Sequence, residues 1–66
     1  MTLEELIDKT ENVEMLSIIP LCDGVTGGKD AVTSKAWYLA RKGCEVKSVN
    51  VGLRDGKAEL KIEIIK

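Results

Sequence analysis

The sequence contains no histidine and only two cysteines, Cys22 and Cys44, among its 66 residues. Histidine is the most frequent general acid–base residue, and with cysteine it supplies most zinc ligands. Two cysteines without histidine cannot complete a four-ligand zinc or iron–sulfur site within one chain. No pair of carboxylates lies in an apolar context that would shift a pKa. We therefore expect no metal, no cofactor and no enzymatic activity.

Long apolar runs and targeting signals are also missing. No stretch approaches the roughly 20 apolar residues that a membrane span needs. Residues 1–5 lack both the basic start and the apolar run of a signal peptide. One conceivable disulfide without a secretory signal favours reduced thiols. These absences predict a cytoplasmic protein that does not enter membranes, with both cysteines serving as small buried apolar residues.

Aromatic residues are nearly absent: there is no phenylalanine, one tryptophan and one tyrosine. The core must therefore be built from Leu, Ile, Val, Ala and Met. A chain of this length forms one domain, residues 1–66, and buries only about 60% of its unfolded surface. Ten basic and eleven acidic residues give a net charge of −1. This balance argues against nucleic-acid binding over the whole surface, although it permits a local basic face.

The clearest structural signal lies in residues 45–66, where Asp55-Gly56 separates two alternating runs. Asp-Gly favours a type I′ turn, because that turn needs a positive φ at both central residues. A two-residue turn fixes the strand register, which pairs Arg54 with Lys57, Leu53 with Ala58, Val51 with Leu60 and Val49 with Ile62. One face of this hairpin is entirely apolar, and we expect the core to use it fully.

The preceding chain begins with a short helix and a strand. Thr2 and Glu5 form a capping box, which predicts a helix over residues 2–11. Residues 13–22 are rich in strand formers, with apolar side chains on both faces. Because Pro20 cannot donate to a ladder, we place this strand at a sheet edge or ending near Pro20.

A glycine-rich loop, residues 23–29, leads to a second predicted helix over residues 31–42. Asp30 is the expected N-cap and Gly43 stands at the position of a C-terminal capping glycine. The apolar stripe of this helix is narrow and made of small residues, which suits close packing on a sheet. It consists of Val32, Ala36, Leu39 and Ala40.

The element order α-β-α-β-β predicts a two-layer α+β domain with a three-stranded sheet and both helices on one face. A right-handed crossover through the second helix makes the first strand parallel to the second. The third strand then lies between them, antiparallel to both, in the order 1-3-2. No residue signature assigns the chain to one family of such domains.

A binding surface is predicted on the outer face of the second helix. At about 100° per residue, both aromatic residues and three cations lie away from the centre of the apolar stripe. Trp, Tyr and Arg dominate binding hot spots, so we expect this face to bind another protein. Its residues are Ser34, Lys35, Trp37, Tyr38, Arg41 and Lys42. One structural alternative is that Trp37 folds over the sheet edge and Tyr38 lies flat on the surface, while the cations only complement the helix dipole. In a second alternative these cations face the acidic first helix.

The same helix supports nucleic-acid binding as an alternative function. A basic helix followed by a hairpin is similar in order to the recognition helix and wing of winged-helix DNA-binding domains. This hairpin is longer than a usual wing. Its outer face also alternates in charge through Lys57, Glu59, Lys61 and Glu63, which gives little attraction to phosphate. A protein partner fits the charge balance better.

Self-association is predicted through the first strand. That strand carries more apolar residues than one helical layer can cover, and its edge is expected to be open. A homodimer is therefore expected, with an interface at Met15, Leu16, Ile18 and Ile19.

The glycine-rich loop is a weaker candidate for binding a small anion. Backbone N–H groups near a helix start, together with a lysine, form the outline of such a site. The residues concerned are Gly24, Gly27, Gly28 and Lys29. However, Asp23 and Asp30 stand where a Walker A motif needs Gly and Ser or Thr, so a flexible connection is the favoured interpretation.

Overall fold

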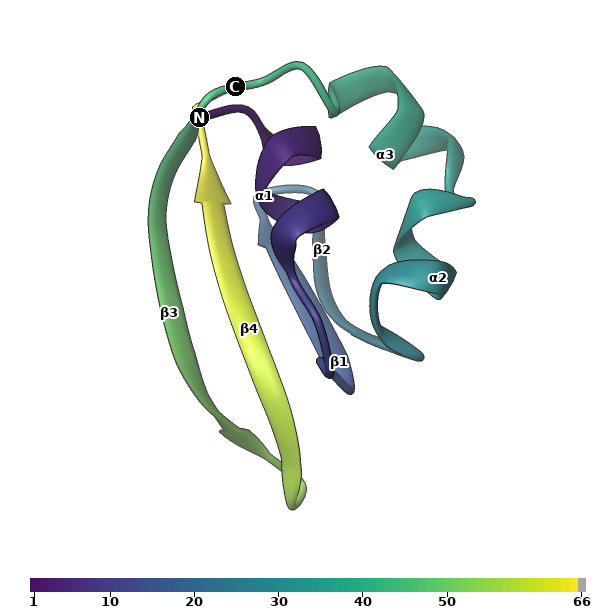
Figure 1. Cartoon of the computed structure of the whole chain (residues 1–66), viewed down its shortest axis with the longest axis vertical. Coiled ribbons are helices and arrows are strands. Elements are labelled where there is room, and N and C mark those ends of the chain that lie inside the picture. Colours follow the sequence, from purple (N-terminus) through teal and green to yellow (C-terminus); the bar gives the residue numbers. More distant parts are fainter. Residues whose placement is uncertain (66) are drawn as a thin grey trace.

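The chain forms a four-stranded mixed sheet with three helices against one face (Figure 1). The structure is a computed structural model that describes residues 1–65, so Lys66, the last residue of the predicted hairpin, lies outside the described residues. In chain order the elements are α1 (Leu3–Lys9), β1 (Met15–Ile19), β2 (Cys22–Thr26), α2 (Gly28–Thr33), α3 (Ala36–Arg41), β3 (Val46–Arg54) and β4 (Lys57–Ile64). The strand order is β2-β1-β4-β3. The predicted α+β class is confirmed.

The capping box at the start of α1 is confirmed. The Glu5 N–H donates to the Thr2 hydroxyl at 3.3 Å, and the Thr2 N–H donates to the Glu5 carboxylate at 3.0 Å. Leu3 and Ile7 are one turn apart and fully buried. A helix of 7 residues is marginal in water by itself, so this buried pair is what stabilises it.

The predicted first strand, residues 13–22, ends at Ile19, in agreement with the alternative in which it ends near Pro20, and residues 20–22 do not continue it. After β1 the chain reverses at Pro20-Leu21, where the Leu21 N–H donates to the Ile18 carbonyl at 2.8 Å, and it returns as β2. The sequence of β2 predicts a loop because Asp and Gly are poor strand formers. It forms a strand because the edge of β1 offers it backbone partners, with Leu16 opposite Val25.

The additional strand overturns the expected sheet. β1 lies inside the sheet, antiparallel to β2 and parallel to β4. The expected three-stranded sheet of order 1-3-2, with the first strand at an edge and antiparallel to the last, is therefore wrong. The three expected strands keep their relative order, β1-β4-β3, within the four-stranded sheet. Because β2 reverses the chain, the helical connection starts from the opposite end of the sheet, and both later strands run the other way relative to β1.

The predicted second helix is broken into α2 and α3. The Ser34 hydroxyl donates to the Ala31 carbonyl at 3.0 Å, and the Lys35 N–H donates to the Val32 carbonyl at 3.0 Å. Ser and Thr hydroxyls compete with the backbone for helix carbonyls, and here Thr33 and Ser34 are adjacent. Lys35 then adopts an extended conformation with φ −80° and ψ 139° before α3 begins.

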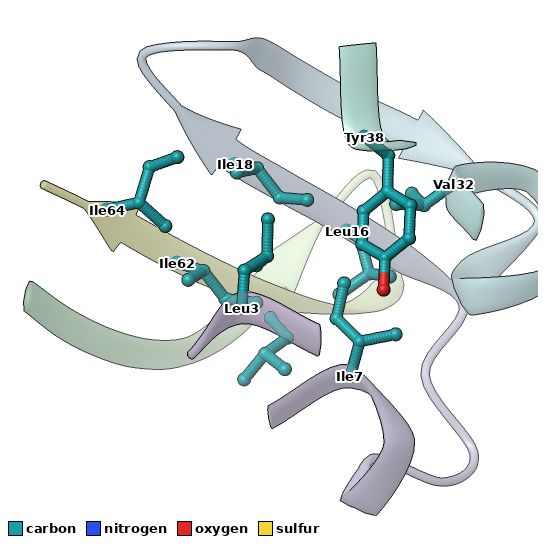
Figure 2. Close-up of a cluster of buried hydrophobic side chains, with 9 residues drawn as sticks. Leu3, Ile7, Leu16, Ile18, Val32, Tyr38, Ile62 and Ile64 are labelled. Atoms are coloured by element: carbon teal, nitrogen blue, oxygen red, sulfur yellow. The ribbon is translucent and has the colours of Figure 1, made fainter. Parts of the chain in front are cut away.

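This break changes which face of the second helical segment is buried. Tyr38 is only 3% exposed and joins the core, whereas Leu39, expected inside, is 55% exposed. Figure 2 shows the Tyr38 ring between Val32 and Ile7, over Leu16. The prediction that Tyr38 lies on an outer binding face is wrong, because the two residues between the helices shift the helical phase.

The hairpin register is confirmed, but its burial is not as expected. Arg54 pairs with Lys57, Val51 with Leu60 and Val49 with Ile62. On the apolar face, Leu60, Ile62 and Ile64 of β4 belong to the core, which also contains buried side chains from all three helices. In β3 only Val46 packs against the core, while Val49, Val51 and Leu53 remain exposed, so the core does not use the hairpin face fully.

The burial of Tyr38 predicts a contrast between two neighbouring substitutions. Tyr38→Ala should lower the free energy of unfolding by about 3–5 kcal/mol, as truncation of a buried aromatic ring does. Leu39→Ala should change it by less than about 0.5 kcal/mol, because the side chain is mostly in water. Urea denaturation followed by circular dichroism measures both. Equal effects would contradict the placement of α3.

Candidate functional site

The largest exposed apolar feature of the sheet is a row of three side chains on β3. Val49, Val51 and Leu53 are 42%, 80% and 79% exposed; we call them the β3 strip. They lie opposite Ile62, Leu60 and Ala58 of β4. Directly opposed residues of an antiparallel pair point to the same face. The β3 strip therefore lies on the helix side of the sheet, yet no helix covers it.

The reach of the helical layer explains this exposure. Leu3 and Ile7 of α1 pack with the β1 and β4 side chains, while α2 contacts β1 and β2. Figure 1 shows the turn end of the β3–β4 hairpin extending beyond all three helices. Three short helices cover the other three strands and end before β3.

The backbone of the β3 strip is also unpaired on one side. In a two-residue hairpin the residues that flank the turn form a hydrogen-bonded pair, and such pairs alternate with non-hydrogen-bonded ones. From Arg54–Lys57 the alternation makes Leu53–Ala58 a non-hydrogen-bonded pair. In agreement, the Ala58 N–H donates away from β3, to the Glu14 carboxylate at 3.0 Å. The N–H and C=O groups of all three strip residues thus point to the open edge.

The N-terminal residues cover the beginning of this edge. The Val46 N–H donates to the Met1 carbonyl at 2.9 Å, and Thr2 forms an antiparallel bridge with Glu45. The N-terminal ammonium group adds an ion pair with the Glu45 carboxylate at 3.1 Å. The part of the edge that stays open therefore begins after Val46 and coincides with the β3 strip.

An apolar groove adjoins the β3 strip on the helix side. It has a volume of about 360 Å³ and runs between the hairpin and the segment from α1 to β1. Its apolar lining comes from Leu6, Val13, Val51, Ala58 and Leu60. The groove and the strip share Val51, so they form one continuous apolar surface at the open edge.

The opposite face of the sheet carries a polar cluster that sequence reasoning missed. The Arg54 guanidinium contacts the Asp23 carboxylate at 2.9 Å and the Glu59 carboxylate at 3.3 Å. The hydrogen bond with Asp23 is the main cause that raises the pKa of Arg54 above its ordinary value. Ser17, fully buried, donates to Glu59 at 2.6 Å and accepts from the Gly24 N–H at 2.8 Å.

This polar cluster joins the turn end of the hairpin to β2 across β1. A side chain at Gly24 would collide with Arg54, because a Cβ built there lies 2.6 Å from a guanidinium nitrogen. The Ser17 hydroxyl is enclosed and both of its hydrogen-bonding roles are used, which fits a structural function. The one available signal was Ser17 itself, a lone polar residue within an apolar strand.

The residues predicted on the second helix do not form one face. Ser34, Lys35 and Arg41 are exposed, Trp37 is half-buried and Tyr38 belongs to the core. The Lys42 ammonium pairs with the Glu4 carboxylate at 3.3 Å. This ion pair matches the structural alternative in which a cation faces the acidic first helix.

The residues predicted for self-association lie elsewhere than expected. Met15, Leu16 and Ile18 are buried and Ile19 is half-buried. Their strand has hydrogen-bonded neighbours on both sides, so it offers no edge to a second chain. The open edge of the sheet that carries apolar side chains is β3.

The fold itself explains why glycine stands at the positions of the predicted anion loop. Gly24 belongs to β2, and Gly27, with φ 104°, caps α2 while its N–H donates to the Glu14 carbonyl at 3.1 Å. Gly28 has φ 65°, and a Cβ there would collide with the Val13 carbonyl oxygen. Lys29 lies beside these glycines, half-buried, in the first turn of α2.

The two cysteines are free, half-buried and packed against the core. Burial raises the pKa of the Cys22 thiol, which disfavours the reactive thiolate. Within residues 1–65 no cluster of His, Cys, Asp and Glu could hold a metal ion. In the same range no helix is long and apolar enough to cross a membrane.

Comparison with known proteins gives no relative: neither a protein-family model, nor a curated protein, nor a solved structure matches the chain. The geometry of the β3 strip and its groove is therefore the basis for a proposed function.

The glycine geometry predicts opposite effects for two substitutions. Gly28→Ala should lower the free energy of unfolding by at least about 1–3 kcal/mol, because of its positive φ and the collision with Val13. Gly52→Ala, in an open part of β3, should be neutral or stabilising by about 0.5–1 kcal/mol. Chemical denaturation measures both. If Gly28→Ala left stability unchanged but abolished phosphate-induced amide shifts in NMR spectra, the structural interpretation would be wrong.

Proposed function

We propose that this protein is a non-catalytic protein-binding module that binds an extended segment of another chain by strand addition to β3. One observation carries the proposal: Val49, Val51 and Leu53 combine exposed apolar side chains with backbone groups directed to an open edge. In strand addition, main-chain hydrogen bonds supply affinity and alternate side chains supply specificity. The β3 strip offers both kinds of contact in the same three residues.

The surface also indicates the chemistry of the bound segment. Its alternate side chains should be small and apolar, because they would lie beside Val49, Val51 and Leu53 and next to the groove. Asp55 lies at the turn end of the open edge, so a cation at one end of the segment would favour one direction of binding. At the other end the Lys47 ammonium is already paired with the Glu63 carboxylate at 3.8 Å. The segment would be antiparallel to β3.

The outer face of α3 supports a binding function less well. It has lost Tyr38 to the core, and Lys42 is already paired with Glu4. Lys35 and Arg41 remain exposed, and two cations give only a weak phosphate attraction. Binding at this face, to protein or nucleic acid, is nevertheless a distinct outcome of the following experiment.

Titration with a synthetic extended peptide tests the proposed function. The peptide alternates valine and threonine and has lysine ends for solubility. It should shift the backbone amide resonances of Val49, Val51 and Leu53 in ¹⁵N NMR spectra more than those of Asn50 and Gly52, whose amides face β4. A peptide of the same composition with a central proline is the matched control, because it lacks a needed N–H donor.

Two results would contradict strand addition at β3. Shifts confined to Lys35, Trp37 and Arg41 would move the binding surface to α3. Equal shifts from both peptides would show contact without strand pairing.

A further inference from the structure

We propose that the segment added to β3 is β3 of a second copy, paired antiparallel about a two-fold axis at Val51. This inference deepens the proposed function, on which it rests, by naming the partner. It follows from the order of residues along the open edge. When two β3 strands run antiparallel, the apolar residues of one copy face the apolar residues of the other. The apolar pattern and the position of the N-terminus select the register.

The apolar residues select one register of the two strands. With Val51 opposite the partner's Val51, Val49 lies opposite the partner's Leu53, and every strip residue faces an apolar residue. Only shifts of two residues keep the side chains on the same face and the free backbone groups aligned. Such a shift in one direction places Leu53 opposite the partner's bulge at Lys47, and in the other direction it places Val49 opposite the partner's turn residue Asp55. Neither position continues a regular strand, so either shift leaves a strip residue without a strand residue opposite it.

The ends of the paired region agree with the same register. The bulge at Lys47 bounds the paired region at one end, and the Asp55-Gly56 turn bounds it at the other. Pairing stops there because the partner's chain turns away at Asp55-Gly56. The next position along the edge is Val46, whose N–H is already bonded to the Met1 carbonyl of its own chain. A register shifted toward Met1 would bring the partner's Arg54 into space that Met1 occupies. The N-terminal residues therefore act as a stop.

The backbone groups of the strip would all be satisfied by this arrangement. Val51 would exchange N–H···O bonds with the partner's Val51, and Val49 would exchange them with the partner's Leu53. The two sheets would join into one continuous sheet. A two-fold axis perpendicular to that sheet keeps the helices of both copies on the same face. The two β3 strips then form one apolar band between the two α1 helices.

The centre of β3 lacks the features that protect edge strands of monomers. Such edges usually carry inward-pointing charges, prolines or bulges. Here the bulge is at Lys47, between Val46 and Ser48, and it adjoins the N-terminal stop. The segment from Val49 to Leu53 has no charge and no proline. The features that would prevent edge pairing thus end where the segment from Val49 to Leu53 begins. This favours β3 of a second copy as the strand that pairs with this segment.

Sedimentation equilibrium of the full chain tests the dimer. The wild type should be a dimer that dissociates on dilution. Val51→Lys places like charges opposite each other on the axis and should weaken dimerisation by about tenfold or more. Leu39→Lys is the matched control, because it makes the same kind of change on exposed α3 and should leave the dimer intact. A wild type that stays monomeric at millimolar concentration overturns the inference, as does a Val51→Lys variant that dimerises normally.

Disulfide trapping tests the register. In a background with Cys22→Ala and Cys44→Ala, checked for folding by circular dichroism, Val51→Cys should cross-link with itself under mild oxidation. Paired Cα atoms would be about 5.5 Å apart, within disulfide range. Val49→Cys alone should not cross-link, because its partner copy would be about 13 Å away along the strand. A mixture of Val49→Cys with Leu53→Cys should yield the mixed dimer.

The outcomes separate this inference from the proposed function. A monomer whose strip amides still respond to the alternating peptide overturns the dimer and leaves strand addition standing. A monomer that binds no peptide overturns both. Preferential trapping of Val49→Cys with Val51→Cys would show edge pairing in a different register and would contradict the axis at Val51. If the background variant does not fold, sedimentation of wild type and Val51→Lys still decides the dimer.

Discussion

The parallel pairing of β1 with β4 is the interaction on which the other elements depend. It places Leu16 beside Leu60 and Ile18 beside Ile62, and these side chains form the platform for the helices. Helices of 6 or 7 residues are not stable alone, so each needs a buried anchor on this platform. With so short a chain, a helical layer centred on β1 and β4 does not extend to β3 (Figure 1).

The same constraint gives β3 two opposing roles. The fold needs β3 because it supplies the hydrogen-bonding partners of β4, but the helices do not cover its exposed apolar side chains. The polar cluster around Arg54 ties the turn end of the hairpin to β2, so the exposed strand is fixed to the rest of the sheet. A strand held in place with an apolar face and an open edge is suited to pair with another strand. This combination is the basis of the proposed function.

Local chemistry was sufficient to predict part of this structure. The capping box of Thr2 and Glu5 and the Asp55-Gly56 hairpin depend on residues close in sequence, and both were predicted in detail. The sequence could not show β2, because its residues have little strand propensity and its pairing comes from β1. The phase of α3 depends on two residues between the helices, which inverted the expected positions of Tyr38 and Leu39. The binding surface was misplaced for a third reason: periodicity identifies an apolar face but not whether another layer covers it.

Amide hydrogen exchange of β3 as a function of protein concentration tests the central claim most directly. The structure requires that in dilute solution Val49, Val51 and Leu53 exchange fast, while Asn50 and Gly52, bonded to β4, exchange slowly. At high concentration the three strip amides should become protected as the edge pairs. Uniform protection along β3 at every concentration, or no alternation in the dilute protein, would contradict the account of an open edge.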